Sequence, residues 1–228
     1  MSSWLISVES AGGTERHQRT IPREDVVSLD RSTRDLLIGT CLGDGYLEPH
    51  GKGVRLEVVH SVRQRSYAEW KWKQLAIIGC SPMHYCSAAY PFWRFVTKSH
   101  PYIGRLRTVF YRDGKKRVPD NIVELLQTPL ALAVWFMDDG TRDQRHHSMF
   151  FETQGFDREG NEKLQGCLER NFGLRTTITS GGRNRGLRLY VPVRTARRLS
   201  QLVSPFVVAD LRYKLTTIPV TTEDESPR

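Results

Sequence analysis

Two aspartates, Asp44 and Asp139, each follow a long apolar run and each precede a glycine directly. The runs, residues 36–43 and 132–137, are predicted to be buried helices because apolar residues go most of the way round them. A helix C-terminus carries about half a negative charge, so a carboxylate there is unfavourable unless a cation lies beside it. Two carboxylates placed in this same way predict a bound divalent metal.

The starts of both runs carry signals of a helix N-terminus. Residues 32–35 read as a capping box, with Ser32 as the N-cap and Asp35 three positions later. Thr128 is the predicted N-cap of the second helix, and Pro129 falls at its first position, where the missing N–H costs nothing. Both aspartates are therefore expected at the far ends of well-defined helices.

Glycines shape the ends and one face of these helices. Gly45 and Gly140 follow the aspartates and are predicted to end the helices in the left-handed conformation. Gly39 and Gly43 are four residues apart, so they share one face of the first helix. Without side chains on that face, a partner helix can approach closely.

The chain also contains an internal repeat. Lys116 and Lys214 are separated by nearly the same distance as the two aspartates and stand in the same relative place. Each aspartate is followed by a strand-rich stretch, an amphipathic helix, a second strand pair and a short closing helix. Each half thus reads αββαββα, and a repeat this long indicates a duplicated domain. The expected organisation is an N-terminal extension (1–28), a first half (29–127), a second half (128–220) and a C-terminal tail (221–228).

These features together resemble the LAGLIDADG homing endonucleases in their single-chain form with two motif copies. The nine-residue motif matches residues 37–45 and 132–140, with Asp44 and Asp139 at its acidic eighth position. Residues 153–154, 189–192 and 212–215 match further, so the resemblance covers nearly the whole chain. One departure is Val134, which replaces a small third-position residue and predicts looser packing of the second helix on the first.

The resemblance implies a fold and an activity. The expected fold is α+β, a saddle of two pseudo-symmetric halves with the motif helices packed at its centre. The expected activity is site-specific cleavage of both strands of a long, asymmetric DNA target by a monomer that uses Mg²⁺. Two alternatives stay open on the same scaffold: an RNA-binding intron maturase and a non-catalytic DNA-binding regulator. The two acids and two lysines argue against a purely binding role, which needs no carboxylates at the helix ends.

The resemblance also assigns the site residues. Two or three metal ions are expected between Asp44 and Asp139, where they activate water and stabilise the leaving oxygen. Asp138 competes with Asp139 for this role, and Asp139 is preferred because it precedes a glycine as Asp44 does. The full expected set of catalytic and metal-binding residues is Asp44, Asp139, Lys116, Lys214, Gln154, Gly43 and Asp138. The lysines are expected to stabilise charge on the phosphate or to help activate water.

The strands offer a surface for reading DNA. Alternation puts Arg55 and Glu57 on one face of a strand and aliphatic residues on the other. Four hairpins with basic outward residues favour contact with the major groove, into which a β-ribbon fits. The residues expected to contact DNA are Arg55, Glu57, Arg94, Lys98, Arg175, Thr177, Thr179, Arg183, Arg185, Arg188 and Tyr190.

Composition agrees with a nucleic-acid partner. The chain has 34 Lys and Arg against 25 Asp and Glu, a net charge of +9 and a pI near 9.6, which suits a polyanion. No apolar run approaches the roughly 20 residues of a membrane span, and the first twenty residues lack the apolar core of a signal peptide. An intracellular location, in a prokaryotic cytoplasm or an organelle, is therefore expected. No glycine loop of the nucleotide-hydrolysing type is present.

Overall fold

The computed structural model describes residues 29–216 except 88 and 183–184. The predicted extension before residue 29 and the tail after residue 220 lie outside these ranges. The first half contains α1 (Arg31–Leu42), β1 (Tyr46–His50), β2 (Gly53–Ser61), η1 (Val62–Gln64), α2 (Arg65–Gln74), η2 (Ala76–Ile78), β3 (His84–Cys86), β4 (Phe92–Val96) and α3 (Pro101–Phe110). A small hairpin, β5 (Tyr111–Arg112) and β6 (Lys115–Lys116), and the short α4 (Ile122–Leu125) lead to the second half.

The second half repeats this order. It contains α5 (Pro129–Asp139), β7 (Gly140–Arg142), β8 (Met149–Phe151), α6 (Arg158–Phe172), β9 (Thr177–Ser180), β10 (Leu187–Val191), α7 (Val193–Val203) and η3 (Ala209–Lys214). Its sheet has the order β7-β8-β10-β9, and the first sheet has the matching order β1-β2-β4-β3, with antiparallel pairing throughout. The predicted αββαββα repeat is therefore confirmed, and the α+β saddle has two pseudo-symmetric halves.

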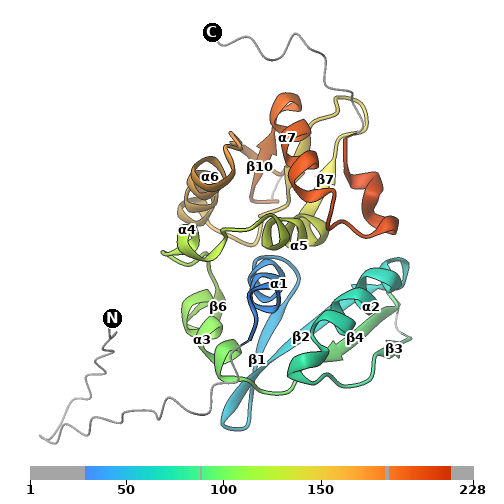
Figure 1. Cartoon of the computed structure of the whole chain (residues 1–228). Helices are drawn as coiled ribbons and strands as arrows, with labels where there is room; N and C mark the ends of the chain where they lie inside the picture. The colour runs from blue at the N-terminus through green and yellow to red at the C-terminus, as the bar shows by residue number, and fades with distance from the viewer. Residues whose placement is uncertain (1–28, 88, 183–184, 217–228) are drawn as a thin grey trace, which may run out of the picture.

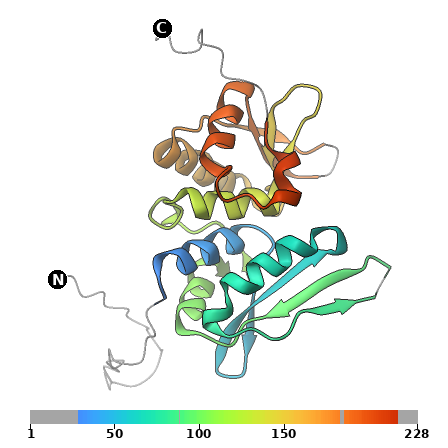
Figure 2. The ribbon, with the colours of Figure 1, turned by 45° about the vertical axis from the view of Figure 1, so that its right-hand side comes forward.

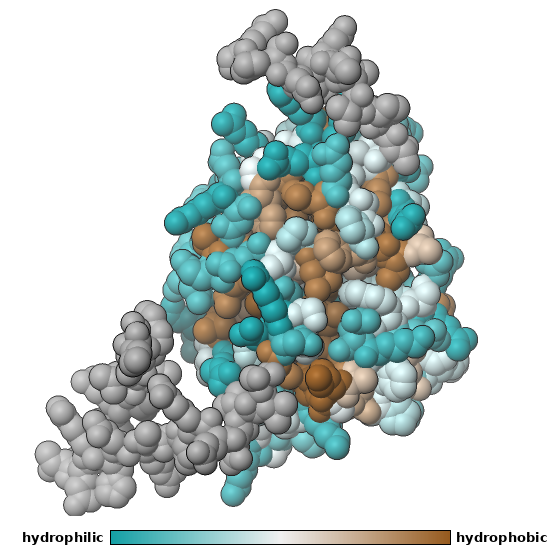
Figure 3. All heavy atoms as spheres, in the orientation of Figure 1, coloured by the Kyte–Doolittle hydropathy of each residue, from teal (hydrophilic) through white to brown (hydrophobic). Residues whose placement is uncertain are grey.

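The motif helices α1 and α5 pack against each other where the two halves meet (Figures 1 and 2). In α5 the residues from Ala131 to Met137 are buried, and α1 is buried from Leu36 to its end. On the face shown in Figure 3, hydrophobic residues gather along the middle of the molecule and hydrophilic residues surround them. The C-terminal ends of both helices are thereby fixed at the centre of the protein.

Close contacts explain the glycines of the first motif. A Cβ on Gly39 would lie 2.4 Å from the Ala131 carbonyl oxygen and 2.7 Å from the Val134 Cβ. A Cβ on Gly43 would lie 2.4 Å from the Asp138 Cβ. The predicted close approach through these two glycines is confirmed. Val134 does not loosen the interface, because Gly39 provides the space that its larger side chain fills.

Two predictions about helix ends are wrong. The N-cap of α1 is Asp30, whose Oδ1 accepts the Thr33 N–H at 2.6 Å, and Ser32 lies inside the helix and donates its hydroxyl to Asp30. Gly45 and Gly140 do not adopt the left-handed conformation; neither has a positive φ. Glycine is needed at these positions because there is no room for a side chain: a Cβ on Gly140 would lie 2.3 Å from the Phe136 carbonyl oxygen.

The second-motif cap and the amphipathic helix of the second half agree with the sequence. The Thr128 hydroxyl accepts the Ala131 N–H at 3.2 Å, and Pro129 begins α5. The amphipathic helix predicted in the second half is α6, which spans Arg158–Phe172 and ends at Gly173, which has a φ of 64°. No helix in the described ranges is long and apolar enough to cross a membrane.

Candidate active site

The two motif aspartates lie at the C-terminal ends of the two packed helices. Asp139 is the last residue of α5, and Asp44 follows α1 after Gly43 and leads into β1. The Asp44 side chain is 43% exposed, and no hydrogen bond to its carboxylate is recorded among the described residues. The Asp139 carboxylate accepts one hydrogen bond, from Trp135 Nε1 at 3.2 Å. Both carboxylates thus keep oxygen atoms available for a further partner.

The electrostatics of these carboxylates favour a cation. Burial raises the pKa of Asp44, and the charge of Asp138 raises it further. Burial also raises the pKa of Asp139 to about 8, with smaller contributions from Asp138 and Asp44. Like charges in a partly buried place resist joint ionisation. A divalent cation beside these carboxylates would reduce that penalty, so their charges suit a metal.

Each of the two lysines binds backbone carbonyl oxygens at the C-terminal end of one motif helix. Lys116 Nζ donates to the Gly43 and Gly45 carbonyl oxygens at 2.5 and 3.1 Å. Lys214 Nζ donates to the Met137 carbonyl oxygen at 2.6 Å and lies 3.4 Å from that of Asp138. Burial lowers the pKa of both amines.

Each lysine therefore supplies the positive charge that a helix C-terminus favours, next to the motif aspartate. The same contact occupies the Gly43 carbonyl oxygen, which was expected to ligate metal, with the amine of Lys116.

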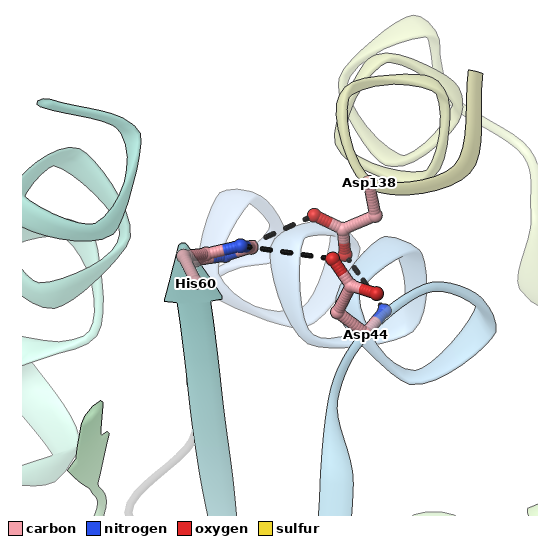
Figure 4. A group of neighbouring side chains, drawn as sticks. All are labelled: Asp44, His60 and Asp138. Carbon is pink, nitrogen blue, oxygen red and sulfur yellow. Dashed lines mark hydrogen bonds and ion pairs between the residues drawn. The ribbon is translucent and has the colours of Figure 1, made fainter. Parts of the chain in front are cut away.

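Asp138 lies in a buried cluster with residues of α2. Lys71 Nζ donates to both of its oxygens, at 2.7 and 2.8 Å, and the Tyr67 hydroxyl donates to Oδ1 at 2.8 Å. The backbone N–H of Asp44 donates to Oδ2 at 3.1 Å (Figure 4). The side chains of Lys71 and Asp138 are both fully buried. Four donor contacts saturate this carboxylate, whereas those of Asp44 and Asp139 are largely open.

His60, at the end of β2, points between Asp44 and Asp138 (Figure 4). Its Nδ1 lies 3.6 Å from Asp44 Oδ2 and its Nε2 lies 4.0 Å from Asp138 Oδ1; within the described ranges neither nitrogen has a hydrogen-bond partner. Burial and the nearby Lys71 lower its pKa to about 3, so the imidazole is neutral. Potential ligand atoms of the three residues lie within 4.8 Å of one another, a spacing that could hold a metal ion.

The sequence did not single out His60, Tyr67 or Lys71. One signal was available for His60: the alternation of β2 places it on the inner face after Leu56 and Val58, where a polar residue is unusual. No comparable signal marks Lys71, which lies between Trp70 and Trp72 on α2.

Gln154 lies in a polar network rather than against the aspartates. Its Nε2 donates to Glu152 at 2.5 Å. Glu152 also accepts from the Thr141 hydroxyl at 2.8 Å and from Arg188 at 3.3 Å. The network lies next to the end of β7, the strand that follows Asp139.

Most residues expected to contact DNA occupy the sheet faces turned away from the helices. In the first sheet, Glu57 and Val59 lie opposite Val96 and Arg94, whereas the register partners Val58 and Phe95 are buried. In the second sheet, Arg188 pairs with Thr179 and Tyr190 with Thr177 on the outer face. Outer arginines are ion-paired with neighbouring glutamates: Arg55 with Glu48, Arg94 with Glu57, and Arg188 with Glu152.

The remaining expected contacts are placed differently. Arg175 pairs with Glu169 of α6 at 3.2 Å, at the helical side of the sheet. Lys98 follows β4 and its aliphatic chain lies over Gly79. Arg185 lies in the β9–β10 connection, and Arg183 lies outside the described residues.

The fold and the paired acids at the ends of two packed helices define the LAGLIDADG class of proteins. The chain belongs to the LAGLIDADG DNA endonuclease family, whose pattern it matches over residues 34–199. The solved structure of the homing endonuclease I-WcaI bound to its DNA recognition sequence superposes with a TM-score of 0.73 at 25% identity, covering 83% of this chain and 88% of that one.

Three of the similar curated proteins carry different names. A protein RecA from Mycolicibacterium fallax is 33% identical over 79% of this chain and 45% of its own length, so this chain spans about half of that protein. A cytochrome b mRNA maturase bI2 from Debaryomyces hansenii is 24% identical over 86% of this chain and 79% of its own length. A probable intron-encoded endonuclease 1 from Wickerhamomyces canadensis is 26% identical, covering 82% of this chain and 85% of that protein.

Proposed function

We propose that this protein is a site-specific homing endonuclease that makes metal-dependent double-strand breaks in a long, asymmetric DNA target. The observation that carries this proposal is the convergence of Asp44 and Asp139 at the ends of two packed helices. Burial raises the pKa of both carboxyl groups, and the charge of Asp138 raises both further. A protein without a use for cations would gain stability from neutral residues in these positions.

Asp44 and Asp139 are the proposed anchors for divalent metal, most simply Mg²⁺. Such ions, when bound, lower the pKa of an attacking water and stabilise the leaving oxygen of a phosphodiester. Asp138 is the weaker candidate, because Lys71 already neutralises it and its oxygens carry four donor contacts.

Lys116 and Lys214 contribute positive charge beside each aspartate. Both amines are held by carbonyl oxygens at the helix ends, so they are positioned before substrate arrives. A preorganised cation stabilises the charge that develops on phosphate in the transition state without reorganisation. The charges of Asp44 and Asp139 both act on each amine, so neither lysine serves one aspartate alone.

The outer sheet faces are the proposed DNA-contacting surface. They carry Arg55, Arg94 and Arg188, each held by a glutamate on the same face. An arginine oriented in this way can present its remaining N–H groups to guanine edges or phosphates. The two faces differ in sequence and strand length, β2 having nine residues and β8 three, which suits unlike half-sites. Because one chain supplies both halves, a monomer suffices.

A cleavage selection tests this proposal. The protein is incubated with a randomised or genomic duplex library in Mg²⁺, and in parallel in Ca²⁺. We expect one long site, about two helical turns of roughly 10 bp each, cut on both strands near its middle in Mg²⁺. Ca²⁺, a larger ion with looser geometry, should support binding with little hydrolysis. Specific duplex binding without cleavage in any metal would instead indicate a DNA-binding regulator.

A second candidate function is that of an intron maturase, which the relative named cytochrome b mRNA maturase bI2 favours. Its test is binding and splicing of a structured intron RNA by the same preparation. Tight RNA binding together with no DNA cleavage would make it the better assignment. Salt dependence does not separate the two, because both polyanions release counterions.

A further inference from the structure

The buried cluster around Asp138 connects the two halves of the protein. Asp138 comes from α5 of the second half, whereas Lys71 and Tyr67 come from α2 of the first. The pair of Lys71 and Asp138 is fully excluded from solvent, and the Tyr67 hydroxyl, which donates to Asp138, also lies 3.2 Å from the Val134 carbonyl oxygen. A buried ion pair whose carboxylate accepts several hydrogen bonds favours one geometry, since displacement leaves a charge unpaired.

This cluster holds the backbone of Asp44. Asp138 Oδ2 accepts the Asp44 N–H at 3.1 Å, immediately beside the first proposed metal anchor. The imidazole of His60 lies within 4.0 Å of the carboxylates of both Asp44 and Asp138 (Figure 4). The position of Asp44 therefore depends on a carboxylate from the opposite half, which in turn depends on Lys71 and Tyr67.

Asp139 has no such support. Asp138 stands directly before Asp139 in the second motif, and the same place before Asp44 is taken by Gly43. Gly43 has no side chain to reach toward Asp139, and a Cβ there would collide with Asp138. The Asp139 side chain is held instead by Trp135, from its own helix. The pseudo-symmetric site is thus asymmetric in what positions its two acids.

A second contact fixes α2 against the other half. The Ser66 hydroxyl donates to Asp210 Oδ2 at 2.5 Å, and Asp210 belongs to η3, the segment that carries Lys214. With Lys71 and Ser66 both bound to second-half residues, α2 is attached to the second half at two points, five residues apart.

We propose that Asp138, held by Lys71 and Tyr67, is a positioning residue for Asp44 and not for Asp139. This inference rests on the proposed endonuclease activity, in which each aspartate serves one DNA strand. The two DNA strands of one target are then cut by two aspartates that are held in place by different residues. Weakening the support converts the enzyme into a strand-specific nickase.

The test uses the full chain, Mg²⁺ and the duplex recovered by the cleavage selection, with a different label on each strand. Asp44→Asn and Asp139→Asn first define which strand each acid serves. Lys71→Met should then slow single-turnover cleavage of the Asp44 strand by about 10²-fold, the cost of a small misplacement of a catalytic group. Cleavage of the Asp139 strand and the affinity for duplex should change by less than about threefold, because nothing that holds Asp139 has changed.

Two variants control for folding. Lys71→Met leaves Asp138 buried and unpaired, so Lys71→Met with Asp138→Ala removes both charges together and should fold. It should still slow the Asp44 strand more than the Asp139 strand, because Asp138 acts on Asp139 through its charge and not through a hydrogen bond. Lys73→Met changes an exposed lysine of the same helix and should leave both strands unaffected. Equal slowing of both strands by the double variant would overturn the inference and leave the endonuclease assignment intact. A wild-type protein that cuts no duplex would overturn both.

Discussion

Gly39 of α1 lies directly against Val134 of α5, so that a Cβ on Gly39 would fall 2.7 Å from the Val134 Cβ. The missing side chain of Gly39 therefore makes room for the larger Val134 of the second motif, and the two helices pack closely at this point. The Ala131 carbonyl oxygen is even nearer, at 2.4 Å from the same added Cβ. This contact involves backbone, which cannot rotate away as a side chain can.

Gly39→Ala should destabilise the protein by about 1–3 kcal/mol, the usual cost of overpacking a close interface. Urea denaturation of the variant and the parent measures this difference. Gly166→Ala is the matched control: Gly166 is exposed on α6, with nothing within 4 Å of an added Cβ. That change should stabilise the protein by up to about 1 kcal/mol, because alanine favours helix over glycine. A stable Gly39→Ala variant would contradict the close crossing.

Much of this architecture could be predicted from the sequence. The two motif runs, their aspartates and the repeat of lysines were visible because helix periodicity and duplication leave regular spacing in the chain. The cap of α1 was mistaken because Ser32 and Asp30 are both suitable N-caps and only the chain's path decides between them. The positive φ expected at Gly45 and Gly140 was wrong, since the same residue type also satisfies a purely steric demand.

The cluster of Tyr67, Lys71 and Asp138 had no equivalent signal. Its members meet only because side chains of α2 reach the C-terminal end of α5, and that placement depends on tertiary packing between the halves. A lysine between two tryptophans in the sequence is normally a solvated residue. Contacts between residues so far apart in the chain depend on how the two halves pack, and the spacing of neighbouring residues in the sequence does not reveal them.

Asp44→Asn and Asp139→Asn should each abolish double-strand cleavage while preserving duplex affinity. Each change removes a metal-anchoring charge with almost no change of shape, and each single variant should still nick the strand served by the other acid. A plasmid assay that separates supercoiled, nicked and linear forms gives the result directly. Metal-dependent linearisation by the double variant would refute the assignment of these residues.

Lys116→Met and Lys214→Met should slow cleavage by about 10²–10⁴-fold, the range for losing an acid–base or charge-stabilising group. Single-turnover rates at saturating protein isolate this effect from binding. Lys115→Met is the control, because Lys115 is the exposed neighbour of Lys116. Equal losses for Lys115 and Lys116 would show only a phosphate-binding patch.

The raised pKa of Asp139, about 8, predicts that metal binding and proton release are linked. Without metal the folded protein holds a proton on Asp139 that the unfolded chain, with an ordinary aspartate pKa near 3.8, has lost. Between these two values the folded state binds more protons, so the stability of the metal-free protein should fall as pH rises. Above pH 8 both states are ionised and this contribution becomes constant.

Mg²⁺ should reverse this trend, because the ion replaces the proton and stabilises the ionised carboxylate. Thermal unfolding at pH 5, 7 and 9, with Mg²⁺ and with a chelator, measures both curves. The stabilisation by Mg²⁺ should grow with pH up to about 8, and apparent metal affinity should rise close to tenfold per pH unit where one proton is displaced. Asp139→Asn carries no such proton and should flatten the metal-free curve between pH 5 and 8. A wild-type protein whose metal affinity is independent of pH in this range would show that Asp139 is ionised before metal binds, and that some other group compensates its charge.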